Sequence, residues 1–88
     1  MRSTEFEDLN EAYQQLRIEA ESIRARVKHH RKSLEALRIR KQNSRSTLHI
    51  DKQMKECSSN LNVERAQLEV LDELLATIAK EIGELGEF

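Results

Sequence analysis

Apolar residues recur at alternating spacings of three and four along residues 6–37, the heptad pattern of a helix that packs along one seam. The residues of this first seam are Phe6, Leu9, Tyr13, Leu16, Ala20, Ile23, Val27, Leu34 and Leu37. His30 is its one polar interruption. Thr4, followed by Glu7 three positions later, has the spacing of a capping box. The pattern therefore predicts a first helix over residues 4–41.

A second seam with the same spacing occupies residues 50–85. Its apolar members are Ile50, Met54, Cys57, Leu61, Leu68, Leu71, Leu75, Ile78, Ile82 and Leu85. Glu64 is the one interruption, and Gly83 and Gly86 mark the expected end because glycine favours helix termini. The pattern predicts a second helix over residues 48–83, followed by a frayed end over residues 84–88.

The two seams do not share a phase, because extending the first one beyond Leu37 selects almost only polar positions. Between them, residues 42–47 read Gln-Asn-Ser-Arg-Ser-Thr, side chains that compete with helical hydrogen bonds and favour caps and turns. We therefore expect a loop over residues 42–47. Asn43 is the candidate for a left-handed C-cap, and Ser46 or Thr47 is the candidate N-cap of the second helix.

Folding the chain back at this loop pairs the two seams layer by layer. Phe6 then faces Leu85, small Ala20 faces a large Leu71, and the polar His30 and Glu64 fall in adjacent layers, where they reach each other or water. The predicted fold is all-α, an antiparallel two-helix coiled-coil hairpin roughly 55 to 60 Å long. The alternative is one continuous helix in a parallel coiled-coil dimer, a rod of roughly 120 Å.

A lone pair of helices buries few side chains relative to the number of residues that it orders, so we expect self-association. Apolar residues outside the seams supply a possible second interface. Those residues are Ile18, Ile39, Val63, Val70 and Leu74. The preferred assembly is a dimer of hairpins that forms a four-helix bundle.

The composition argues against an enzyme. The 88 residues include three aromatics, two glycines and no proline, too few turn formers for a barrel, a sandwich or a doubly wound sheet. We find no glycine-rich phosphate loop and no supported nucleophile, base and orienting group. His29, His30 and Cys57 supply about two of the four ligands of a structural zinc site. We therefore predict no catalytic residue, no metal and no cofactor.

The two ends and the single cysteine suggest a context for the chain. Arg2-Ser3 and Glu87-Phe88 are dipeptides that common cloning sites encode. The hypothesis is that residues 1–3 and the last residues are additions to a segment of a longer protein. One cysteine cannot form an internal disulfide, so the expected compartment is the cytoplasm or nucleus. No apolar run approaches the roughly 18 residues of a membrane span.

Charge is unevenly distributed, although the formal net charge is only −1. Residues 24–55 hold eleven Lys or Arg against two acids, a balance of +9, whereas residues 1–23 carry −4 and residues 56–88 carry −6. Three interpretations of the basic block, residues 24–55, are open. It is a solvated face, it directs two hairpins to pair antiparallel, or it makes the loop a polyanion-binding tip. The tip residues are Arg38, Arg40, Lys41, Arg45 and Lys52.

These features predict a non-enzymatic coiled-coil interaction and oligomerisation module, as in segments of scaffold, motor, cytoskeletal or trafficking proteins. The seam residues carry this function, and the partner is a second copy or another helical protein. The alternative is a hairpin whose basic tip binds nucleic-acid phosphates, acidic protein tails or anionic lipid. Neither function involves a small-molecule substrate.

Overall fold

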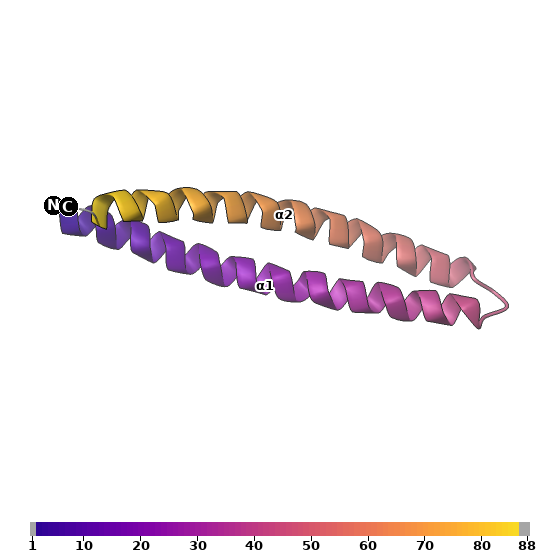
Figure 1. Ribbon diagram of the computed structural model, residues 1–88. Helices are drawn as coiled ribbons and strands as arrows, with labels where there is room; N and C mark the ends of the chain where they lie inside the picture. The colour runs from indigo at the N-terminus through magenta and orange to yellow at the C-terminus, as the bar shows by residue number, and fades with distance from the viewer. Residues whose placement is uncertain (1, 87–88) are drawn as a thin grey trace.

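The computed structural model describes residues 2–86 as two long helices that lie side by side and antiparallel (Figure 1). α1 is Arg2–Gln42, α2 is Leu48–Gly86, and residues 43–47 join them. The described residues contain no strand, and the hairpin measures 67 × 15 × 14 Å. The all-α hairpin is thus confirmed. The alternative of one continuous helix is wrong, because the chain reverses between Gln42 and Leu48.

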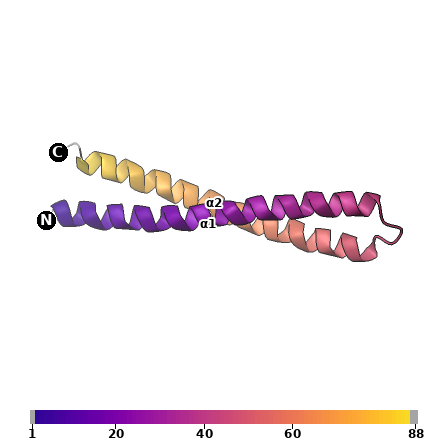
Figure 2. The same ribbon diagram turned by 90° about the horizontal axis from the view of Figure 1, so that it is seen from below.

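The helices cross rather than run parallel over their whole length. After a quarter turn of the molecule, α2 passes across α1 near the middle of the hairpin (Figure 2). Heptad spacing explains the crossing, because a seam with 3.5 residues per repeat drifts around a helix with 3.6 residues per turn. The helices must wrap to keep the two seams in contact.

The core follows the two seams. Its buried apolar residues are Ala20, Ile23, Val27, Ile50, Cys57 and Leu61. The remaining seam residues are half-buried, except Phe6 in the last layer at the open end, which is exposed. Ile23, Val27 and Leu61 form one buried cluster, and Leu68 and Leu71 pack against it. The seams therefore bury each other within one chain, and the core is one layer thick.

Both helices extend beyond their predicted ends. Ser3 and Thr4 are helical, so Thr4 does not have the non-helical backbone that the N-cap of a capping box requires. α2 continues through Gly83 to Gly86, since Gly83 keeps a negative φ and the half-buried Leu85 still packs along the seam. Residues 84–86 are therefore helix and not a frayed end. Met1, Glu87 and Phe88, part of the proposed additions, lie outside the described residues.

The loop closes without a left-handed residue. No residue in the described range has a positive φ, so the predicted left-handed C-cap at Asn43 is wrong. Instead, the Asn43 N–H donates to the Arg40 carbonyl at 3.2 Å, and its side-chain amide donates to the Ile39 carbonyl at 3.2 Å. These bonds tighten the last turn of α1 and satisfy its free carbonyls, which makes a left-handed residue unnecessary.

Thr47 occupies the N-cap position that the sequence offered to Ser46 or Thr47. α2 begins at the next residue, and the Thr47 carbonyl accepts the first helical hydrogen bond from the Asp51 N–H at 2.7 Å. Ser44 Oγ donates to the Ser46 carbonyl at 2.9 Å, which braces the loop before the cap. Short polar side chains thus shape the turn, as their composition predicts.

Candidate interaction surfaces

A polar layer interrupts the apolar seam at mid-length. The His30 ring donates a hydrogen bond from Nδ1 to Oε2 of Glu64 at 2.9 Å, and the two side chains are only 22% and 14% exposed. The Cys57 thiol donates to the His30 carbonyl at 3.1 Å. The two interruptions therefore meet, which is one of the two outcomes that their adjacent layers allow. Within residues 2–86, no cluster of three or more His, Cys, Asp or Glu is arranged to hold a metal ion.

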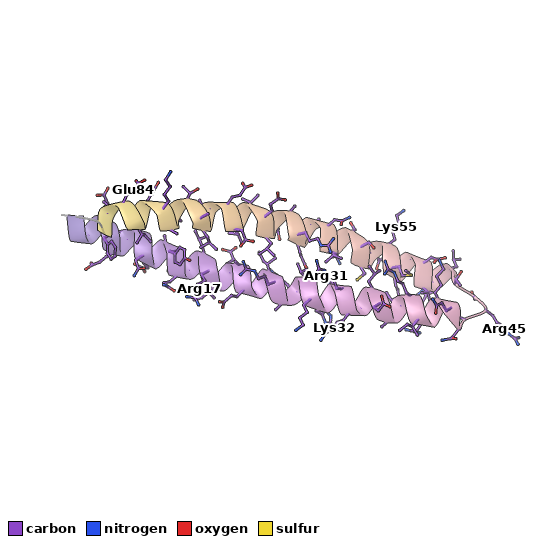
Figure 3. All side chains as sticks on the ribbon, in the orientation of Figure 1. Arg17, Arg31, Lys32, Arg45, Lys55 and Glu84 are labelled. Atoms are coloured by element: carbon purple, nitrogen blue, oxygen red, sulfur yellow. The ribbon has the colours of Figure 1, made fainter. Side chains whose placement is uncertain are left out.

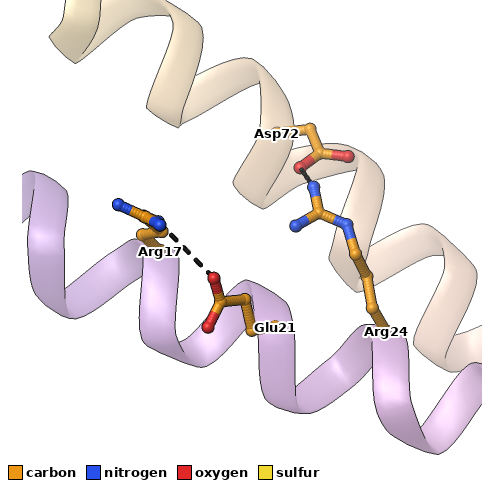
Figure 4. Close-up of polar contacts among 4 residues, drawn as sticks. All are labelled: Arg17, Glu21, Arg24 and Asp72. Carbon is orange, nitrogen blue, oxygen red and sulfur yellow. Dashed lines mark hydrogen bonds and ion pairs between the residues drawn. The ribbon is translucent and has the colours of Figure 1, made fainter.

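One flank of the hairpin carries a cross-helix ion pair. Arg24 Nη2 donates to Oδ1 of Asp72 at 2.6 Å, beside an Arg17–Glu21 pair at 3.5 Å within α1 (Figure 4). All four side chains are about half exposed, so solvent screens these pairs. Sequence reasoning missed the Arg24–Asp72 pair. The signal was present, because each residue directly follows a seam residue, and these two seam residues, Ile23 and Leu71, belong to adjacent predicted layers.

The basic tip lies at the closed end, with Arg45 at its apex (Figure 3). Two of its five cations are matched by acids, since Lys41 Nζ lies 2.7 Å from Asp51 and Arg38 lies 3.5 Å from Glu35. The hydrogen bond from Lys41 and its positive charge lower the pKa of Asp51 below its usual 3.8, and a hydrogen bond from Thr47 adds to this.

The other three cations of the tip are exposed. Those residues are Arg40, Arg45 and Lys52. The structure shows no ion pair for them within residues 2–86. Their positive charge is therefore directed to solvent, and the tip can attract an anionic group.

An apolar stripe remains uncovered on one side of α2. Val63, Val70 and Leu74 are 56%, 63% and 43% exposed. We call these three residues, with Ala66 between them, the α2 flank. Val70 and Ala66 also line an open groove between the helices, whose floor reaches the core residues Ile23 and Leu71. The flank is thus continuous with the core and not a set of scattered surface residues.

The structure does not bring the five predicted second-interface residues together. Ile18 is 66% exposed, and it lies two positions from both Leu16 and Ala20. Two positions rotate a helical side chain by about 200°, so Ile18 faces away from α2. Ile39 lies two positions from the seam residue Leu37 and is also exposed. The predicted interface therefore divides into the α2 flank and two separate residues on the back of α1.

Charge follows the long axis of the molecule. Glu84 lies near the open end, whereas Arg31, Lys32, Lys55 and Arg45 lie in the half that includes the loop (Figure 3). Folding the chain therefore gathers the basic block of residues 24–55 at one end, and residues 4–23 and 56–86 place their acidic excess at the other. The hairpin is electrically polar from end to end.

The chain was compared with protein-family models, with curated proteins and with solved structures, and none of them matches it. Across the described residues, neither helix has an apolar stretch long enough to cross a bilayer. The surfaces of the hairpin are therefore the basis for a functional proposal.

Proposed function

We propose that this chain is a non-enzymatic helical association module, which binds a second copy or another helical protein. Modules of this kind serve scaffold, motor, cytoskeletal and trafficking proteins. The two seams pack against each other inside the hairpin, so association uses the apolar surface that they leave over. That surface is the α2 flank, and its exposure is the observation that carries the proposal.

The amount of exposed surface supports association. The chain exposes 6931 Å², whereas a compact monomer of 10.3 kDa exposes about 5,400 Å². The excess of about 1,500 Å² in one chain exceeds the roughly 800 Å² that each partner buries in a standard protein interface. Part of it follows from the elongated shape. A side-by-side contact between two hairpins would bury the solvent-exposed area along their long sides, which is the area that the elongated shape adds.

Light scattering on two matched variants tests this proposal. Val70→Glu places a charge on the α2 flank, and Ile18→Glu places one at an equally exposed site on the back of α1. We expect the unaltered chain to exceed its 10.3 kDa monomer mass. Val70→Glu should weaken association roughly tenfold or more, because an interface would bury its charge. Ile18→Glu should have little effect. A monomer at all concentrations with no helical partner, or equal effects of both variants, would contradict the proposal.

A second candidate function rests on the exposed cations at the tip. In this alternative, Arg40, Arg45 and Lys52 bind a polyanion through charge, without sequence readout, because no Phe, Tyr or Trp lies among residues 24–55 to stack on bases. The probes are an oligonucleotide, a polyglutamate peptide and phosphatidylserine vesicles. Replacing the three cations with Gln should abolish binding, whereas Gln at Lys28, Lys32 and Lys55 should only weaken it. No binding to any probe at low salt would exclude this function.

A further inference from the structure

We propose, resting on the association function above, that the partner of the α2 flank is a second copy of this chain lying antiparallel to the first. The register is one in which facing residues of the two α2 helices have numbers that add up to 133. The two-fold axis then passes between Ala66 and Gln67, midway along α2, so the two α2 helices overlap over their full length.

The apolar residues of the flank match in this register. Val63 faces Val70 of the second copy, and the two-fold axis repeats the pair on its other side. Leu74 faces the small Ser59 of the second copy. The most exposed apolar residues of α2 between Val63 and Leu74 are thereby covered at the centre of the contact, where burial is most effective.

Charge selects this register over its neighbours. At the ends of the contact, Lys52 faces Glu81 of the second copy and His49 faces Glu84, so opposite signs or polar groups meet. A shift of one heptad in one direction sets Glu56 against Glu84, two like charges. The opposite shift sets Leu74 against Lys52, which would desolvate a cation on an apolar side chain. Of these three registers, only the proposed one avoids both penalties.

The α1 side of the same groove is independently self-complementary. At intervals of seven along this side, α1 presents Glu5, Ala12, Glu19, Arg26, Ser33 and Arg40. Glu19 and Arg26 line the groove beside the α2 flank. In the proposed register, reversal of a second copy brings Glu19 within about one helical turn of Arg26, and Glu5 within about one turn of Arg40. A parallel copy would instead set like charges together.

The opposite side of α1 lacks this property. At intervals of seven, from position 17 toward the tip, it presents only basic residues, namely Arg17, Arg24, Arg31 and Arg38. Reversing a second copy there would set arginine against arginine. The self-complementary pattern thus occurs on the same side as the exposed apolar flank, and two separate features of the sequence point to one face.

Disulfide trapping tests the register. In a Cys57→Ala background, Val63→Cys and Val70→Cys are oxidised separately and as an equimolar mixture. We expect covalent dimer in the mixture and no more than about a tenth of that yield in either variant alone. Identical positions would be displaced by seven residues, about 10 Å, which exceeds the reach of a disulfide. Cys57→Ser is a second background, because its hydroxyl can keep the hydrogen bond to the His30 carbonyl.

Spin labels at Arg45→Cys, in the same background, test the orientation. Because the hairpin is 67 Å long, antiparallel copies hold their apices about 6 nm apart, whereas parallel copies hold them within about 2 nm. Cross-linking of Val63→Cys or Val70→Cys alone, absence of any cross-link in a dimer, or adjacent apices would overturn this inference and leave the association function standing. A chain that remains monomeric by light scattering would overturn this inference as well, whether or not another helical protein binds.

Discussion

Nδ1 of His30 on α1 lies 2.9 Å from Oε2 of Glu64 on α2, in the middle of an otherwise apolar seam. Sliding one helix past the other by a heptad would set each group against apolar side chains without a hydrogen-bonding partner. The hydrogen bond between them therefore forms only in the observed register of the hairpin. Single polar residues specify the register of other coiled coils in the same way.

Removing one member of this pair should cost more than removing both. His30→Leu leaves the half-buried Glu64 without its donor, so we expect the free energy of unfolding to fall by about 1–3 kcal/mol. The double variant with Glu64→Leu should recover most of that loss, since it restores an apolar layer. Urea denaturation followed by circular dichroism gives both values. Simple additivity of the two single variants would show that the groups do not interact.

Because the core contains few buried side chains, shortening one of them should lower the stability of the hairpin markedly. Ile23→Ala removes one of the few buried side chains and should lower the free energy of unfolding by about 2–4 kcal/mol. Ile18→Ala removes the same atoms from the exposed back of α1 and should change it by less than about 0.5 kcal/mol. Thermal or urea unfolding compares them. Similar losses at both positions would mean that the back of α1 is covered in solution.

The pKa of the Asp51 carboxyl should lie below its usual value of 3.8. A lowered pKa in the folded chain means that the carboxylate form contributes stability above pH 3.8, and that this contribution is lost as the pH falls through the lower folded pKa. Carbon-detected NMR of the Asp51 carboxyl measures the shift. Lys41→Gln should bring the pKa back toward 3.8, whereas Lys28→Gln, on the shaft of α1, should leave it unchanged. An Asp51 that titrates the same with or without Lys41 would refute this explanation.

Replacing Asn43 with glycine should destabilise the hairpin. If residue 43 were left-handed, Asn43→Gly would raise the stability of the hairpin. However, Asn43 has a negative φ, and its side chain donates to the Ile39 carbonyl. The substitution removes that bond and adds backbone freedom to the unfolded chain, so we expect a loss of about 0.5–1 kcal/mol. A melting temperature that rises in the Asn43→Gly variant would place the residue in the left-handed region instead.

Most of the fold was predictable because heptad spacing constrains every turn of a long helix. Leu9 and Ile82, which the numbering pairs in one layer of the predicted seams, are both half-buried. The meeting of His30 with Glu64 was one of the two outcomes that the same pairing allowed. Long-range contacts are simple to derive here, because one reversal of the chain determines all of them.

The prediction was less accurate where several local arrangements cost nearly the same free energy. At Asn43, a left-handed cap and a tightened last turn both satisfy the free carbonyls, and the sequence does not rank them. The end of α2 was misplaced because the seam contact of Leu85 outweighed the weak helix propensity of Gly83. The second interface was overextended to Ile18, because apolar character was considered without its rotation about the α1 axis.

The two open helix ends lie close together, with Leu9 and Leu85 lining the same shallow groove there (Figure 1). A hairpin of this kind can be inserted into a surface turn of a host domain without separating the residues on either side of that turn. The hairpin would then project from the domain and hold its positive apex nearly 7 nm from the attachment point. Its reach would scale with added heptads, at about 1 nm for each pair inserted symmetrically into both arms.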